Sequence, residues 1–368
     1  MKMPKNSLAA DLDHILDHTR LLWEDLRGER LFITGGTGFL GCWLLESFLW
    51  INERLKLDAH VTVLTRSPAA FIAKIPHLAL AENVSLLAGD IRTFVFPTGT
   101  FSHVIHAATD ASAKLNAENP LLMLDTITEG TRRTLDFSSQ CGAKNFLLTS
   151  SGAVYGKQPA DLTHIPEDYL GAPDLFNPQS AYGQGKRLAE HFCALYGKTS
   201  RMEIKIARCF AFVGPYLPLD IHFAIGNFIR DGLNGGPIIV QGDGTPQRSY
   251  LYAADLAIWL LTILFKGQAL RPYNVGSDES LSIAEVVQRV AEQFPAKIAV
   301  EIRGTPNPQK PLERYVPDIK RAKNELGLDV WVDLASGIRR TIKIFNIESR
   351  VHCKKVFNTK DTTYTKDK

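Results

Sequence analysis

From residue 30 onward, short apolar runs rich in β-branched residues alternate with stretches of helical periodicity. Seven of the runs have the length and composition of strands: 30–35, 60–65, 84–89, 103–108, 145–150, 203–209 and 273–276. They are nearly continuous in apolar residues, which is typical of parallel strands covered by helices on both faces. The pattern therefore predicts an α/β protein built on a doubly wound parallel sheet.

An amphipathic helix is predicted ahead of the first strand. Ser7 is its expected N-cap and Gly28 its expected end. Its apolar residues recur on one helical stripe: Leu8, Leu12, Ile15, Leu16, Leu22, Trp23 and Leu26. We assign residues 1–29 to an N-terminal extension that packs on the body or at a subunit contact.

The alternation of strands and helices is interrupted in two segments rich in Pro and Gly, 214–250 and 278–345. We expect them to form a smaller α/β lobe at the carboxyl ends of the strands, where open α/β sheets bind ligands. The main domain is expected to comprise 30–213, with 251–277 returning to it. Residues 346–368 are expected to form a basic, flexible tail.

Composition narrows the class of protein. With 45% hydrophobic and 22% charged residues, the chain is typical of a globular protein. The formal charge is +3, but from Arg350 onward six Lys or Arg face two Asp, so the body is close to neutral. This distribution argues against a nucleic-acid partner.

Cysteine usage and hydropathy bear on the compartment. The five cysteines are scattered without C-x-x-C spacing, which suits a reducing compartment and argues against a metal site. The N-terminus is polar, and the apolar run 256–265 is about half the length of a membrane span. We therefore expect a cytoplasmic protein without a membrane partner.

The segment "ITGGTGFLG" (33–41) follows the first strand and opens a helix. Its glycines allow a tight turn and close approach to a pyrophosphate, while the helix N-terminus supplies N–H groups. A merely structural turn is the alternative. The cofactor contacts expected here are Gly35, Thr37, Gly38, Phe39, Leu40 and Gly41.

The second strand ends "VLTRSP", with Thr65 where an NAD-preferring site expects an acidic residue. Arg66 follows, and a guanidinium suits a ribose 2′-phosphate. We therefore favour NADP over NAD, with a merely solvated Arg66 as the alternative. Asp90 and Ile91, after the third strand, are expected near the adenine; Asp90 could equally cap its own loop.

Six motifs occur in order: "TGGTGFLG", "HAA", "TSSGAVYG", "YGQGK", "GDGTPQRSYLYAADLA" and "YNVG". Over about residues 30–345 the chain thereby resembles the extended short-chain dehydrogenase/reductase family, in its NAD(P)-dependent nucleotide-sugar epimerase/dehydratase group. The resemblance implies a Rossmann-type fold and a nucleotide-diphosphate sugar as substrate. It implies catalytic roles for Ser151, Tyr182 and Lys186.

The resemblance also implies ligand contacts. Further cofactor contacts are expected from Ala107, Ala108, Thr109, Tyr182 and Lys186. Substrate contacts are expected from Ser151, Gly152, Asn227 and Arg248, with Arg248 on the diphosphate.

The residue chemistry agrees with these roles. A free tyrosine has a pKa near 10, and a nearby ammonium favours its phenolate. Lys186 lies at i,i+4 from Tyr182, on the same face of one helix. Ser151 can orient the reacting hydroxyl or carbonyl of the sugar.

The net reaction depends on the residues after Ser151. The family's 4,6-dehydratases resemble "T-D-E-V-Y-G", and its decarboxylases keep the Glu. Here these positions are Gly152 and Ala153, which cannot move protons. We therefore expect an epimerase or 4-keto reductase acting at sugar carbon 4. A dehydratase or decarboxylase using Glu167 or Asp168, and a non-catalytic NAD(P)-sensing regulator, are the alternatives.

Two positions depart from the family pattern. Ala211 replaces the Asn of "R-x-F-N", and Ile127 replaces the Asn that usually precedes Gly-Thr. The sugar is therefore expected to be atypical. The family commonly pairs the Tyr-Lys helix and its neighbour across a homodimer interface. The apolar residues Leu188, Phe192 and Leu195 could contribute to it, and the alternative is that they face the sheet.

Overall fold

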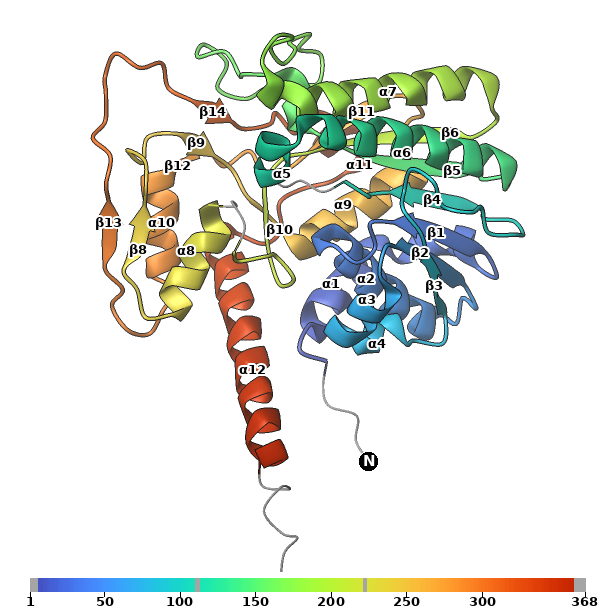
Figure 1. Ribbon diagram of the computed structural model, residues 1–368, viewed down its shortest axis with the longest axis horizontal. Helices are drawn as coiled ribbons and strands as arrows, with labels where there is room; N and C mark the ends of the chain where they lie inside the picture. Colours follow the sequence, from blue (N-terminus) through green and yellow to red (C-terminus); the bar gives the residue numbers. More distant parts are fainter. Residues whose placement is uncertain (1–5, 110–112, 221–223, 361–368) are drawn as a thin grey trace, which may run out of the picture.

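The structure is a computed structural model that describes residues 6–109, 113–220 and 224–360 (Figure 1). Seven parallel strands form one sheet in the order β11-β6-β5-β4-β1-β2-β3. They are β1 (Arg30–Thr34), β2 (His60–Thr65), β3 (Val84–Ala88), β4 (His103–His106), β5 (Asn145–Ser151), β6 (Glu203–Cys209) and β11 (Pro272–Val275). Each predicted strand lies in this sheet with ends within two residues. The predicted fold class is confirmed.

Helices cover both faces of the sheet (Figure 1). One face carries α1 (Ala9–Thr19), α2 (Phe39–Leu55), α3 (Pro68–Lys74), α4 (Pro76–Ala79) and α9 (Ala253–Lys266), and the other carries α5 (Ala113–Glu118), α6 (Pro120–Gln140) and α7 (Ala181–Thr199). Along a strand, successive side chains point to opposite faces of the sheet. Leu31 and Ile33 pack in the first layer, and Phe32 between them packs in the second.

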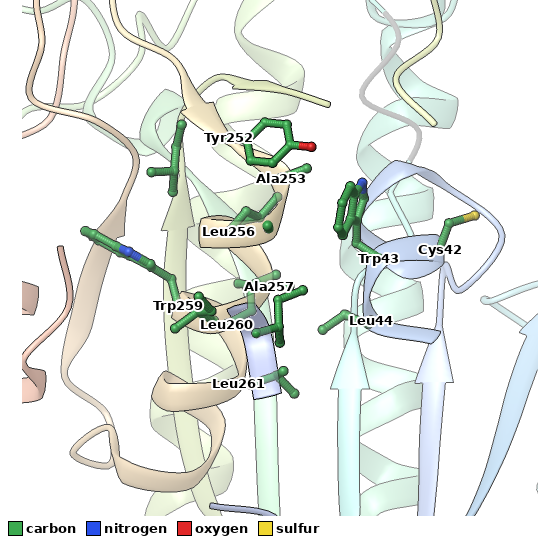
Figure 2. Packing of buried hydrophobic residues seen from close by; sticks show 14 of the residues in the cluster. Cys42, Trp43, Leu44, Tyr252, Ala253, Leu256, Ala257, Trp259, Leu260 and Leu261 are labelled. Atoms are coloured by element: carbon green, nitrogen blue, oxygen red, sulfur yellow. The ribbon is translucent and has the colours of Figure 1, made fainter. Parts of the chain in front are cut away.

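The core of the first face is centred on α2 and α9, shown in Figure 2. The indole of Trp43 on α2 lies edge-on to the ring of Tyr252, with centroids 6.0 Å apart. Its Nε1 donates to the carbonyl of Pro215 at 2.9 Å, so the indole is both buried and satisfied. Nearly every residue of α9 is buried, which accounts for its continuous apolar run. Among the described residues, no helix is long and apolar enough to cross a bilayer.

Beside the sheet, strands from the segments 214–250 and 278–345 pair with one another, and we call this part of the molecule the lobe (Figure 1). Strand β8 (Ile238–Val240) pairs with β13 (Val300–Ile302), and β9 (Gln247–Arg248) lies between β12 (Leu281–Ser282) and β14 (Arg314–Tyr315). Each pairing joins one segment to the other. The remaining elements are β7 (Phe212–Val213), β10 (Leu251–Tyr252), α8 (Ala224–Leu233), α10 (Ile283–Ala291), α11 (Lys320–Leu326) and α12 (Leu334–Lys360).

Helix α12 continues to Lys360, so the backbone of residues 346–360 is helical where we expected a flexible tail. In Figure 1 its end projects away from the body. Residues 361–368 lie outside the described residues.

The N-terminal extension differs locally from its prediction. The N-cap is Leu8 and not Ser7, because the Asn6 side chain accepts from the Leu8 N–H at 2.8 Å. The single predicted helix divides into α1 and a 3-10 segment, η1 (Arg20–Leu26). Thr19 stands at the division, where its hydroxyl donates to the Ile15 carbonyl and accepts from Trp23 Nε1.

Two buried aspartates tie this extension to the rest of the chain. Asp11 accepts from the Tyr252 hydroxyl at 2.8 Å and from the guanidinium of Arg340. Asp255, fully buried on α9, accepts from the backbone N–H groups of Trp331 and Val332 at 2.9 Å each. His14 Nε2 lies 3.1 Å from the other carboxylate oxygen of Asp255. Residues distant in sequence are therefore joined at α9.

We predict that Asp255→Ala lowers the free energy of unfolding by about 2–4 kcal/mol, because two backbone donors lose their acceptor inside the protein. Chemical denaturation measures the change. The control is Asp17→Ala, whose carboxylate on α1 is 71% exposed and should cost less than about 0.5 kcal/mol. Equal stabilities of the two variants would contradict the anchoring role of Asp255.

Candidate active site

The strand order reverses between β1 and β4, and open α/β sheets bind ligands in the crevice outside the carboxyl ends of the strands at such a point. Gly35 follows β1 with φ +72°, a conformation that favours glycine. A Cβ at this position would lie 2.4 Å from the carbonyl oxygen of Ala107, which follows β4. The backbones of the two strand ends are therefore in contact. A glycine is required at position 35 because of its positive φ and because a Cβ there would collide with Ala107.

The loop after β1 also permits the close approach of α2. A Cβ on Gly41 would lie 2.3 Å from the Cα of Gly36 and 2.4 Å from the carbonyl oxygen of Gly35. Gly38 is the N-cap of α2 and provides no side-chain cap for it. The first turn, which begins with Phe39 and Leu40, thus presents N–H groups beside a loop almost free of side chains. This cradle fits the diphosphate of a dinucleotide.

The residues expected to lie near the adenosine half of the cofactor differ in exposure and in their hydrogen bonds. Thr65 is buried at the end of β2, and the next side chain, Arg66, is exposed. Asp90 accepts from the Arg92 backbone N–H at 2.9 Å and from its guanidinium at 2.9 and 3.1 Å. These bonds hold the pKa of Asp90 below its usual range. Asp90 therefore caps its own loop, which is the alternative considered from the sequence. The adenine contacts of Asp90 and of the buried Ile91 stay predictions.

Lys186 is anchored between two strand ends. From α7 its ammonium donates to the carbonyl of Thr149 on β5 at 2.8 Å and to the hydroxyl of Thr109, after β4, at 2.9 Å. Burial lowers the pKa of Lys186 to about 8. The ring of Tyr182, one turn earlier, has its centroid 5.9 Å from this ammonium. Lys186 therefore connects the cofactor crevice with Tyr182.

Ser151 ends β5 and caps the short 3-10 segment η2 (Gly152–Tyr155), since its hydroxyl accepts from the Ala153 N–H at 3.1 Å. Burial raises the pKa of Tyr182 to about 12, and the neighbouring hydroxyl of Ser151 opposes this rise. The structure thus brings together the three side chains expected to be catalytic.

Sequence reasoning missed one neighbour of this group, Tyr315 on β14. Its ring lies 4.7 Å, centroid to centroid, from that of Phe210. A Cβ on Gly152 would lie 2.8 Å from the Tyr315 oxygen. Tyr315 belongs to a two-residue strand outside the motifs, so no local pattern singled it out.

Two of the expected substrate residues, Arg248 and Asn227, lie in the lobe, whereas Ser151 and Gly152 lie at the end of β5 and the start of η2. Arg248 on β9 is in register with Tyr315 on β14 and forms an ion pair with Glu313. Asn227 on α8 accepts from Arg230 Nη1 at 3.2 Å. Arg248 thus borders the Ser151 group through Tyr315, whereas Asn227 is engaged by its own helix.

The two carboxylates considered as displaced proton carriers have other partners. Buried Glu167 accepts from the Asn274 N–H on β11 at 3.0 Å and lies 3.8 Å from Arg321 Nε. Asp168 is 88% exposed and bonds to Arg321 Nη2 at 2.5 Å. Both are therefore held at Arg321, and these contacts lend no support to a role beside Ser151.

Together, the sheet, the glycine cradle and the grouped Ser, Tyr and Lys define a dinucleotide-binding enzyme. The model of the NAD dependent epimerase/dehydratase family matches residues 31–276, and the chain belongs to this family. Its members depend on NAD, which agrees with the cradle after β1.

Curated relatives are similar over most of the chain. UDP-glucuronic acid decarboxylase 1 of Danio rerio is 30% identical over 321 residues, covering 87% of this chain and 73% of that protein. UDP-glucuronic acid decarboxylase 6 of Arabidopsis thaliana is 31% identical over 311 residues, covering 84% and 86%.

Solved structures share the architecture. UDP-glucose 4-epimerase of Thermus thermophilus, in complex with NAD, has a TM-score of 0.71 and 26% identity, covering 86% of this chain and 99% of that one. dTDP-glucose 4,6-dehydratase of Bacillus anthracis, also in complex with NAD, has a TM-score of 0.71 and 19% identity, covering 86% and 96%. At 19% identity the second likeness concerns the fold alone.

We predict that Gly41→Ala destabilises the cofactor-free protein, because the new methyl group meets backbone atoms that cannot move aside. Gly38→Ala is the matched control, since its Cβ would meet the Gly35 carbonyl oxygen at an ordinary 3.5 Å. Thermal unfolding should show a loss of several degrees for Gly41→Ala and little change for Gly38→Ala. The reverse order would contradict the packing described for the cradle.

Proposed function

We propose that this protein uses a bound NAD-type cofactor to oxidise a nucleotide-diphosphate sugar at carbon 4. The observation that carries the proposal is the convergence of Ser151, Tyr182 and Lys186 beside the β1–β4 crevice. Nicotinamide, when bound, accepts a hydride from the sugar and can return it. The protein must then supply a base for the hydroxyl proton and hold the sugar in place.

Each of the three residues has a role that follows from its contacts. Tyr182 takes the proton from the carbon 4 hydroxyl. Lys186 is held by Thr109 and Thr149, and its positive charge favours the phenolate of Tyr182. Ser151 hydrogen-bonds to the carbon 4 oxygen and to Tyr182. Arg248, next to this group, binds the diphosphate of the substrate.

For the net reaction we favour decarboxylation of a nucleotide uronic acid. This corrects the order of our sequence-based alternatives, because the curated relatives at 30–31% identity are UDP-glucuronic acid decarboxylases. Oxidation at carbon 4 makes the sugar a β-keto acid. The bond from carbon 5 to the carboxylate then breaks, its electron pair forms an enolate with the carbon 4 oxygen, and CO2 leaves. A proton adds to carbon 5, and return of the hydride with a proton restores the hydroxyl.

This sequence of steps needs no carboxylate at position 152 or 153, because the ketone itself accepts the electrons. Gly152 and Ala153 are therefore compatible with decarboxylation. They weigh more heavily against a 4,6-dehydratase, in which a hydroxyl must be expelled from carbon 6 with the help of an acid.

A second candidate is 4-epimerisation, our expectation from the sequence. It is favoured by the Ser–Tyr–Lys set, which is sufficient for it, and by the 26% identity to a UDP-glucose 4-epimerase structure. In that case the hydride returns to the opposite face of the same carbon, and no atom is lost.

Mass spectrometry of products separates these reactions. We predict that UDP-glucuronic acid incubated with the NAD-loaded protein loses the mass of CO2, with no net change in NADH. Formation of a 4-epimer from UDP-glucose or UDP-galactose would favour the second candidate, and stoichiometric consumption of NADPH would indicate a reductase. Tyr182→Phe should lower kcat by about 100-fold or more while cofactor binding persists. Unchanged cellular function of this variant would favour the non-catalytic regulator.

We further propose that Arg66 makes the site prefer NADP over NAD. Its exposed side chain directly follows β2, whose end faces the ribose in this fold. We predict that Arg66→Ala weakens NADPH binding by about tenfold or more and leaves NADH binding nearly unchanged, as measured by calorimetry. Tighter binding of NADH than NADPH by the unaltered protein would contradict the preference.

We also propose a cytoplasmic homodimer. Leu188 and Leu195 on α7 are large apolar side chains that remain 40% and 47% exposed in the single chain. A partner that covers this face would bury them. Light scattering of the intact chain determines the oligomeric state.

A further inference from the structure

Helix α7 begins at a point where its own sequence provides no cap. Its N-cap is Ser180, whose side chain makes no capping hydrogen bond within the described residues. The first N–H groups of a helix have no acceptor inside the helix, so they need one from elsewhere. Tyr182 lies in this first turn, and its backbone N–H is one of these groups. The start of the helix that carries Tyr182 and Lys186 therefore depends on a residue outside it.

Asn116 on α5 provides the missing acceptor. Its side-chain oxygen Oδ1 accepts from the Tyr182 N–H at 3.0 Å, and its Nδ2 donates to the carbonyl of Gln179 at 2.8 Å. A backbone N–H can only donate and a backbone carbonyl can only accept, so the two bonds together determine the orientation of the amide. The bond to Tyr182 is the one that an asparagine at the N-cap itself would make to the second residue of the helix. Asn116 thus acts as the N-cap of α7 from another helix.

The chain after β4 contacts the Tyr182–Lys186 pair twice. Thr109, which follows β4, accepts from the Lys186 ammonium at 2.9 Å. Asn116, further along the same connection, holds the backbone of Tyr182. The connection from β4 to α6 therefore touches both residues of the pair, the lysine at its side chain and the tyrosine at its main chain.

We propose that Asn116 is a positioning residue, which supplies the N-cap that α7 lacks and thereby fixes Tyr182 relative to Lys186. Lys186 has its own anchors in Thr109 and Thr149, so it stays in place when the cap is lost. Tyr182 lies in the first turn, where helices fray, so the tyrosine moves while the lysine does not. The inference rests on the proposed function in that Tyr182 acts there as acid and base.

The next turns of α7 are held independently of Asn116. Gln184 Nε2 donates to the Pro173 carbonyl at 3.0 Å, and Arg187 Nη1 donates to the carbonyls of Val154 and Gly171 at 3.0 and 2.8 Å. Loss of the Asn116 side chain should therefore loosen the first turn and leave the helix in place. An effect confined to that turn can be separated from unfolding of the whole protein.

The test is Asn116→Ala, read first without any substrate. In protein with isotope-labelled tyrosine, the amide resonance of Tyr182 is assigned by its loss in Tyr182→Phe, and its hydrogen exchange is followed by NMR. We predict that the Tyr182 N–H exchanges about fivefold faster or more in Asn116→Ala, because loss of an asparagine cap weakens the start of a helix by about this factor. In turnover, kcat should be about tenfold lower with KM little changed, since the acid/base group is displaced and the substrate contacts remain.

The matched control is Asn119→Ala. Asn119 is the N-cap of α6, and its side chain accepts from the Leu122 N–H at 3.1 Å. Each variant removes one asparagine cap, so the two should lower the melting temperature by similar amounts. Only Asn116→Ala should speed exchange at Tyr182 and lower kcat. Asn116→Asp keeps an acceptor for the Tyr182 N–H, so exchange there should be slower than in Asn116→Ala.

Unchanged exchange of the Tyr182 N–H in Asn116→Ala would overturn the inference, whatever the protein turns over. Faster exchange with an unchanged kcat would overturn the positioning role, and so would an equal loss of kcat in Asn119→Ala. Faster exchange in a protein that turns over no nucleotide sugar would support the cap and count against the proposed function alone.

Discussion

The close contact of backbones where the strand order reverses is the constraint on which the site depends. Gly35 brings the end of β1 against Ala107, and Gly41 lets α2 approach the same loop. A side chain at either position would separate these elements by the width of a methyl group or more. The close approach of β1, α2 and Ala107 is possible because Gly35 and Gly41 carry no Cβ, and the start of α2 has no side-chain cap because its N-cap is Gly38. This is the part of the fold that fits the diphosphate of a dinucleotide.

Around this crevice, reactive groups are held by strand ends. Lys186 is tied to the residues that follow β4 and to β5 itself, and Ser151 is fixed by the backbone of η2. Burial works against both charged forms, because it raises the pKa of Tyr182 and lowers that of Lys186. The site therefore needs hydrogen bonds aimed at the Tyr182 oxygen to favour its ionised form. The neighbouring hydroxyl of Ser151 favours that form.

Much of the fold could be predicted from the sequence, because its signals are local. Strands such as 145–150 and 203–209 are continuous apolar runs, and the glycine spacing of 33–41 has one common structural use. The pattern misplaced the N-cap of the first helix, which is Leu8 and not Ser7, because the Asn6 side chain accepts a hydrogen bond from the Leu8 N–H. For Asp90 the pattern left two alternatives open. The bonds that Asp90 accepts from Arg92 agree with the loop cap, and its adenine contact stays a prediction. The net reaction could not be predicted from the residues after Ser151. We favour decarboxylation because of the curated relatives at 30–31% identity.

By itself, the sequence determined the sheet and predicted the cofactor loop and the Ser–Tyr–Lys group, since the signal for each lies within short stretches of the chain. Only the tertiary structure decided what stands beside that group. Tyr315 lies 164 positions after Ser151 and meets it because β14 pairs with β9 in the lobe. The space vacated by the absent side chain of Gly152 is filled by a phenol from elsewhere in the chain. Close packing requires that the space beside Gly152 be filled, but the residue that fills it cannot be predicted from the sequence around position 152.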